Sequence, residues 1–221
     1  MMKTNLLLVA ILLCLFPSFA DAQLTILRDN GTGIPITANP YREVKGSAYL
    51  EDFTKGKIFL PDGQWVEGLQ IALNAYENTL EYKLEGSLFS YTSDKLSGFT
   101  YTSSKEGLVE FTSAYEIPTL KERRFVQVLE KGKYILLIHV YKIMTDDPSA
   151  TYGTQAAKVF QSQQELFVVS GGKVYLMKGK EKDLNEIFGQ DAAKAGEWIK
   201  SQKLNVKDMD DMRALIRQLN Q

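Results

Sequence analysis

A single histidine carries most of the catalytic chemistry open to this 221-residue chain. His139 lies within an apolar run at 134–141, and strand alternation puts it on one face with Ile135, Leu137, Tyr141 and Ile143. An imidazole there is a candidate general base or pH switch. The alternative is a buried histidine with a structural role. The sequence favours this second interpretation, because a base needs a hydrogen-bonding partner and no motif beside His139 supplies one.

The residue types give little support for a metal site or for a catalytic nucleophile. One histidine cannot build a two-histidine site, and Cys14 is the only cysteine. The acidic groups at 146–147 and 208–211 lack the spacing of a calcium-binding loop and are typical of a turn and a helix start. No G-x-S-x-G elbow occurs. We therefore predict no metal, no cofactor and no catalytic residue.

Glycoside hydrolysis stays open as an alternative, because it requires only two suitably spaced carboxylates. The chain has 27 aspartate and glutamate residues, so composition alone does not decide the matter. The carboxylates of Glu51, Asp52, Glu67 and Glu81 are all predicted at turns or outward strand positions. The sequence thus leans away from an enzyme without excluding a carboxylate-based glycan hydrolase.

Aromatic residues are the remaining resource for binding. Tyr91, Phe99 and Tyr101, followed by Phe111 and Tyr115, alternate with serine and threonine in adjacent predicted strands. Such a face could stack on a sugar or contact a partner protein. Packing within the sheet is the alternative, since strands are enriched in aromatic residues anyway. The candidate ligand-binding residues are Tyr91, Phe99, Tyr101 and His139.

The charge composition and the N-terminal sequence limit the kinds of partner and the location that this chain can have. The 26 basic and 27 acidic residues give a net charge of −1, so there is no basic excess with which to bind nucleic acid. The N-terminus has the three parts of a secretory signal: Lys3, an apolar run over 6–16 and the small residues of Ala20-Asp21-Ala22. We predict cleavage after Ala22, a periplasmic or extracellular location, and no membrane span in the processed chain.

The elements that follow are mainly strands. A leader over 23–46 is either a linker or contains one short strand at 24–27. Asp62-Gly63 and Gly171-Gly172 are predicted hairpin turns, and Asn74 to Asn78 makes another turn. Strands are predicted at 57–60, 65–71, 79–84, 88–91, 98–102, 108–112, 125–130, 133–144, 164–170 and 173–177. The run over 134–141 is apolar on both faces, which predicts a central strand covered on both sides. The segment 145–163 is predicted to be a long exposed connection.

The C-terminus changes to helical periodicity. Helices are predicted at 183–188, ending at Gly189, from Asp191 onward, and from Asp208 onward with Met209, Met212, Leu215, Ile216 and Leu219 on one face. The fold class is therefore α+β: an antiparallel sheet layer, as a sandwich or open barrel, with small C-terminal helices. We predict a signal peptide at 1–22, a leader at 23–46, a β domain at 47–180 and a helical extension at 181–221 docked on the sheet.

Several segments together resemble a family of secreted proteins of unknown function from Bacteroidetes-type bacteria. The resemblance is carried by Gly46-Ser47-Ala48-Tyr49-Leu50, by 56–63 with Glu67-Gly68-Leu69, by 74–82, by Gly172-Lys173-Val174-Tyr175-Leu176 and by Lys182-Asp183-Leu184. It covers nearly all of 47–221 and implies export and a β-rich fold. It implies no catalytic residues.

The function predicted from the sequence is an exported, non-enzymatic envelope or periplasmic protein that binds a protein or glycan partner. The sheet and the 145–163 segment are the candidate contact surfaces. A structural module that tethers the sheet through its C-terminal helices is a further hypothesis.

Overall fold

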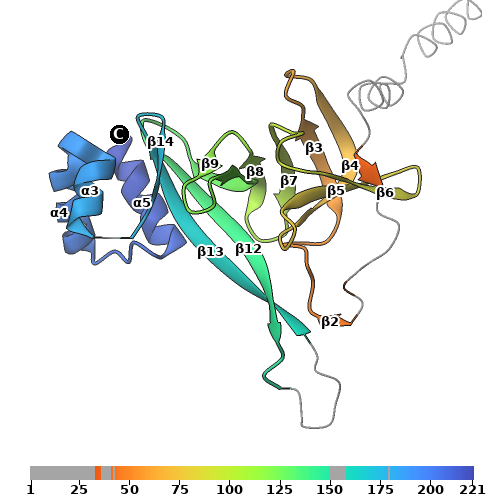
Figure 1. Ribbon diagram of the computed structural model, residues 1–221. Coiled ribbons are helices and arrows are strands. Elements are labelled where there is room, and N and C mark those ends of the chain that lie inside the picture. The colour runs from red at the N-terminus through yellow and green to blue at the C-terminus, as the bar shows by residue number, and fades with distance from the viewer. Residues whose placement is uncertain (1–32, 36–40, 42, 150–157, 179) are drawn as a thin grey trace, which may run out of the picture.

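The computed structural model describes residues 33–35, 41, 43–149, 158–178 and 180–221 (Figure 1). The predicted signal peptide and the predicted strand at 24–27 lie outside these residues. Within them, twelve strands form one sheet in the order β1-β6-β5-β4-β3-β7-β8-β11-β12-β13-β14, with β2 beside β13. Neighbouring strands are antiparallel except β2 and β13. With the C-terminal helices, this confirms the predicted α+β class.

Most strand bounds lie close to the predicted ones, whereas β13 begins earlier than predicted. They are β1 Ile34–Pro35, β2 Val44–Lys45, β3 Thr54–Phe59, β4 Trp65–Asn74, β5 Thr79–Leu84, β6 Ser87–Tyr91, β7 Gly98–Ser103, β8 Gly107–Thr112, β11 Val126–Glu130, β12 Ile135–Asp146, β13 Lys158–Ser170 and β14 Lys173–Leu176. A separate two-stranded hairpin consists of β9 Glu116–Ile117 and β10 Glu122–Arg123. The predicted glycine turns are confirmed at Gly63 and Gly171-Gly172, whose positive φ angles suit glycine.

Strands β3 to β8 enclose an aromatic core at one end of the molecule (Figure 1). Its fully buried members include Ile58, Leu80, Tyr82, Phe99 and Phe125. The turn between β4 and β5 is joined to the start of β11 through Asn78. The Asn78 amide accepts a hydrogen bond from the Phe125 N–H at 2.9 Å and donates one to the Phe125 carbonyl at 3.3 Å. This pairing brings the β4–β5 turn close to the central strands.

The central strand β12 is covered on both faces where it crosses the core, as its apolar run predicts. Leu136 and Ile138 pack against the C-terminal helices, whereas Leu137 belongs to another cluster with Ile117 of β9. His139 shares the Leu137 face because side chains alternate along a strand. The strand therefore carries His139 to the side of the sheet opposite the helices.

Three α-helices follow the sheet: α3 Glu181–Phe188, α4 Ala192–Gln202 and α5 Met209–Leu219, with a 3₁₀ turn at Gly189–Asp191. Gly189 ends α3 in a left-handed conformation, and the Asp208 carboxylate accepts hydrogen bonds from two N–H groups of α5, both as predicted. Asp191 occupies the N-cap position of α4 but makes no capping hydrogen bond. Its carboxylate instead accepts hydrogen bonds from Lys133 and Tyr134, which attaches the helices to the segment just before β12.

The helices lie against the sheet over a shared apolar cluster. Met212, Leu215, Ile216 and Leu219 of α5 are buried there, as the predicted helix face requires. Full burial of each such side chain stabilises the fold by roughly 1.5–3 kcal/mol. Among the described residues, no helix has the length and apolar character needed to cross a membrane.

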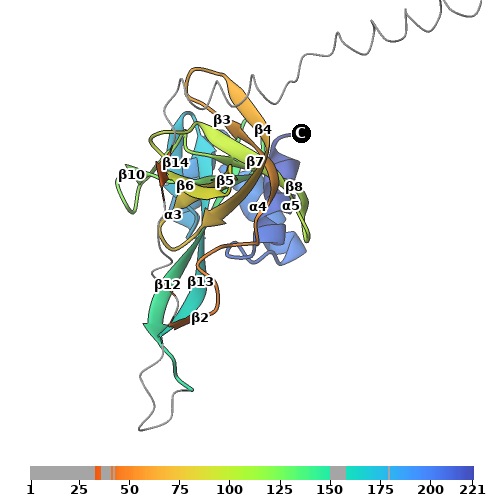
Figure 2. The same ribbon diagram turned by 90° about the vertical axis from the view of Figure 1, so that its right-hand side faces the viewer.

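The predicted connection over 145–163 is wrong at both ends. β12 continues to Asp146 and β13 begins at Lys158, and the two strands pair without a break from Ile135↔Val169 to Asp146↔Lys158. Figure 2 shows the resulting two-stranded ribbon extending away from the rest of the sheet, with β2 alongside it. The start of β13 could not be predicted from the sequence, because residues 161–164 are polar and exposed. A strand that is exposed on both faces shows no alternation of apolar and polar residues. Residues 150–157 lie outside the described part.

Candidate functional site

The four predicted ligand-binding residues lie in two different environments. Tyr91, Phe99 and Tyr101 are in the core, with exposed fractions of 5%, 0% and 7%. Their rings stack on neighbours at centroid distances of 5.2 Å for Tyr82–Tyr91 and 4.7 Å for Phe99–Phe111. Since other protein atoms cover their faces, these three rings offer no surface to a ligand in this conformation. His139 lines a pocket.

The His139 pocket lies between β12, the β4–β5 turn and the β9–β10 hairpin. Its volume is about 250 Å³, and its lining comprises Ala75, Tyr76, Asn78, Thr119, Leu120, Arg124, His139, Tyr141, Lys142 and Glu165. That volume is somewhat below the roughly 300–1,000 Å³ of pockets that hold drug-sized molecules. The pocket is thus sized for one small chemical group.

His139 is buried in this pocket without protein partners for its nitrogens. Only 4% of the residue is exposed, and neither Nδ1 nor Nε2 has a hydrogen bond to any described residue. The ring stacks on Tyr141 at a centroid distance of 5.0 Å. Burial lowers the pKa of His139 to about 4; the positive charge of Arg124 adds to this effect and Glu122 opposes it. The imidazole is therefore neutral at pH 7, with one donor and one acceptor unused.

Glu165 faces His139 from the neighbouring strand. The two residues are direct cross-strand partners in the β12–β13 register, so their side chains share a face. No hydrogen bond joins the carboxylate to either ring nitrogen, and within the described residues Glu165 has no ion-pair partner. The arrangement differs from a catalytic dyad, in which an acid would hold the imidazole.

Arg124 and Lys142 supply the positive charge at the pocket, and both are engaged elsewhere. The Arg124 guanidinium pairs with Glu122, with Nε donating to the carboxylate at 2.9 Å. Lys142 Nζ donates to the backbone carbonyls of Ser47 and Tyr49, and burial lowers its pKa. The Lys142 N–H also donates to the Ala75 carbonyl at 3.0 Å, which fixes one wall of the pocket.

Aromatic and apolar side chains form the rim. Tyr76 and Leu120 are exposed to 37% and 44%. The Tyr76 ring makes edge contacts with Tyr41 at 5.5 Å and with Phe160 at 5.3 Å, between ring centroids. These contacts hold an aromatic surface at the edge of the pocket.

The positions of the carboxylates outside this pocket bear on the hydrolase alternative, which needs two carboxylates in one cleft. The predicted outward position of Glu81 is wrong: the residue is buried and accepts hydrogen bonds from Tyr49 Oη at 2.6 Å and Asn74 Nδ2 at 2.8 Å. Two surface hollows each contain two carboxylates, Asp94 with Glu122 and Glu116 with Glu186. No cluster of three or more potential metal ligands occurs in the described ranges.

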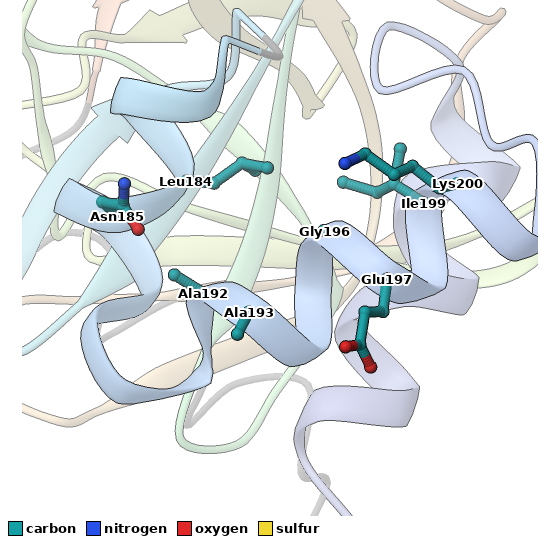
Figure 3. A pocket seen from close by; sticks show the side chains of 8 residues that line it. All are labelled: Leu184, Asn185, Ala192, Ala193, Gly196, Glu197, Ile199 and Lys200. Carbon is teal, nitrogen blue, oxygen red and sulfur yellow. The ribbon is translucent and has the colours of Figure 1, made fainter.

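A further groove runs between α3 and α4 (Figure 3). It measures about 460 Å³, and Leu184 and Ile199 point toward one another across it. Small residues, Ala192, Ala193 and Gly196, form its floor. No unpaired buried polar group lines this groove, so it does not specify a ligand as the His139 pocket does.

Comparison with protein-family models, curated proteins and solved structures gives no match to this chain. The resemblance to a secreted bacterial family stays a prediction.

Sequence reasoning singled out His139 and missed the residues around it. Glu165, Arg124 and Leu120 come from three separate segments that pattern analysis does not connect. A usable signal existed for Glu165, an acidic residue at the start of an apolar strand. Placing Glu165 opposite His139 requires the β12–β13 register. That register could not be predicted from the sequence, because 145–163 was expected to be a long loop.

Proposed function

We propose that this chain is an exported, non-catalytic envelope or periplasmic protein that binds a protein or glycan partner at the His139 pocket. Export is supported by the N-terminal signal pattern with its cleavage site after Ala22. The resemblance to secreted bacterial proteins agrees with it. Binding is supported by one observation above all: a buried imidazole whose two nitrogens lack partners among the described residues, in a residue that lines a pocket.

That observation matters because buried polar groups are nearly always hydrogen-bonded. Leaving a buried donor or acceptor unsatisfied costs about 1–3 kcal/mol, so an apolar residue at position 139 would stabilise the fold better. We infer that a bound partner supplies the missing hydrogen bonds after the side chains that cover both nitrogens in this conformation move aside. The lowered pKa of His139 favours binding over catalysis, because a histidine with a pKa of about 4 is a weak base at neutral pH.

The hydrolase alternative is less well supported. Within the His139 pocket the lining contains one carboxylate, Glu165, where two are needed. In the hollow that contains Asp94 and Glu122, the hydrogen bond from Thr92 lowers the pKa of Asp94. A general acid requires a raised pKa, so this carboxyl group suits an ionised structural role.

Photocrosslinking in the producing cells tests the proposal. A benzoyl-phenylalanine in place of Leu120, at the pocket rim, should form a reproducible adduct with an envelope component. The matched control is Leu108, which is more exposed at 76% and lies outside the pocket lining. The adduct should disappear in the His139→Leu background. Equal labelling at both positions, no adduct, or an adduct insensitive to His139→Leu would contradict binding at this pocket.

Export is tested separately by N-terminal sequencing of the protein recovered from cell fractions. The mature chain should begin at Gln23 and be absent from the cytoplasm. An unprocessed cytoplasmic chain would refute this part of the proposal.

A further inference from the structure

We propose that the open edge of β14 binds an extended, basic peptide segment of a partner protein as an added strand. This surface is separate from the His139 pocket, because the two linings share no residue. Three observations carry the inference: backbone groups without partners along β14, a groove that borders this edge on both faces of the sheet, and a carboxylate without a partner on each of those faces.

The backbone of β14 has unused hydrogen-bonding groups. β14 is the last strand of the sheet, so one of its edges has no neighbouring strand among the described residues. The Met177 N–H, directly after β14, donates to the Leu166 carbonyl of β13 at 2.9 Å. Hydrogen-bonded positions alternate along an antiparallel pair, so Tyr175 also bonds to β13, whereas the N–H and C=O groups of Val174 and Leu176 point to the open edge. No hydrogen bond joins these four groups to any described residue, so they are available to an extended backbone.

A groove of about 490 Å³ is lined by residues 172–175 at this edge. On one face of the sheet its wall includes Tyr115, which packs on the same apolar cluster as the side chain of Val174. On the other face its wall is Glu186 of α3, on the side where Tyr175 packs against the helices. The volume lies within the roughly 300–1,000 Å³ of sites that hold small ligands, which suits a few residues of one strand.

The charges in this groove favour a basic peptide. Its lining contains two carboxylates, Glu116 and Glu186, and one ammonium group, Lys173. Neither carboxylate makes an ion pair or a hydrogen bond with any described residue. Adjacent side chains of an extended peptide point to opposite faces, so two adjacent basic residues can reach Glu116 on one face and Glu186 on the other.

The form of this edge favours a single peptide over a second copy of the chain. β14 is only four residues long and begins with Lys173, which is exposed. Short edge strands and edge lysines are features by which proteins prevent two sheets from pairing edge to edge. A single peptide can enter between Tyr115 and Glu186 without bringing another sheet with it.

The test titrates hexapeptides into the chain from Gln23 onward, with binding followed by NMR through the backbone amides of Val174 and Leu176. The basic probe is Val-Thr-Lys-Arg-Thr-Val and the acidic probe is Val-Thr-Glu-Glu-Thr-Val. We expect saturable shifts with the basic peptide and about tenfold weaker binding of the acidic one, because like charges repel. A basic peptide with N-methyl groups on both central residues keeps its side chains but loses backbone donors, and it should bind about tenfold more weakly.

Substitutions in the chain test the same contacts from the protein side. Val174→Pro removes an N–H that is unbonded in the described fold, and edge strands tolerate proline at such positions. It should weaken binding of the basic peptide about tenfold and leave the urea midpoint close to the parental one. Glu116→Gln and Glu186→Gln should each weaken binding by about two- to fivefold. The matched control is Glu197→Gln, an exposed glutamate on α4 outside this groove, which should bind like the parent chain.

Equal binding of the basic peptide and its N-methylated form would refute strand addition, whether or not Val174→Pro folds. Tightest binding by the acidic peptide, or no binding by any peptide, would overturn the ligand class. Sedimentation equilibrium without peptide tests the other occupant: a dimer that Val174→Pro dissociates would assign this edge to a second copy and overturn the proposal. None of these outcomes decides binding at the His139 pocket, which the crosslinking at Leu120 tests separately.

Discussion

The buried imidazole should make folding stability depend on pH in a way that one substitution removes. Lowering the pH from about 7 to about 4.5 should destabilise the parent chain more than the His139→Leu variant. The physical reason is that the unfolded chain takes up a proton on His139 near its ordinary pKa of 6.5, whereas the folded chain resists protonation until about pH 4. The groups that surround the ring are Arg124, Glu165 and Tyr141.

The magnitude follows from the two pKa values. Because the folded pKa is depressed, the contribution is fully present above the unfolded pKa of 6.5 and declines as the pH falls toward about 4. At 1.36 kcal/mol per pKa unit, the loss between about pH 7 and about pH 4.5 is roughly 2 kcal/mol. Asp147 contributes little over this interval, because hydrogen bonds from Lys45 and Ser149 lower its pKa to about 2.

Urea unfolding at the two pH values measures the effect. The quantity of interest is the change in unfolding free energy of the parent chain minus that of His139→Leu, which cancels the titration of groups common to both. At about pH 7 the variant should be at least as stable as the parent, because an apolar side chain replaces unsatisfied polar atoms. Gln163→Ala, an exposed position on the same ribbon, should keep the parental pH dependence. Equal losses in parent and His139→Leu would refute the buried neutral imidazole.

Three further substitutions test how the pocket and the helices are held. Asn78→Ala removes both hydrogen bonds to the Phe125 backbone and should lower the unfolding free energy by about 2–4 kcal/mol in urea titrations; a loss near zero would show that this link does not hold the turn. Leu215→Ala should lower it by about 2–5 kcal/mol, because it leaves a cavity under α5, and a separate transition for the helices would contradict their docking in one cooperative unit. Tyr134→Phe removes a hydroxyl that hydrogen-bonds to Asp191 and should lower the thermal midpoint by an amount equivalent to about 1 kcal/mol; an unchanged midpoint would argue against this attachment.

Much of the architecture was predictable because local rules determine it. The turns at Gly63 and Gly171-Gly172 require left-handed backbone, which glycine adopts readily. The α5 face repeats at helical spacing, and Asp208 caps the helix by a hydrogen bond within a few residues of itself. Each of these features depends on neighbours in sequence, so pattern analysis can find it.

The errors occur where distant segments decide the outcome. The strand beginning at Lys158 is polar and exposed, and it forms because β12 continues opposite it. Glu81 sits in a strand whose alternation suggested an exposed glutamate, yet Tyr49 and Asn74 satisfy its carboxylate inside the protein. Asp191 has the residue type of a helix cap, but Lys133 and Tyr134, just before β12, donate hydrogen bonds to its carboxylate instead.

By itself, the sequence determined the kinds of elements present, the presence of a single histidine on a buried strand, and a signal pattern at the N-terminus. Only the tertiary structure decided that Tyr91, Phe99 and Tyr101 are core residues, and that His139, although equally buried, is among the residues that line a pocket. The reason is physical: periodicity reports which side chains share a face, but burial and hydrogen bonding depend on what the folded chain brings against that face. For His139, those neighbours are Glu165, Arg124 and a turn contributed by strands far away in the sequence.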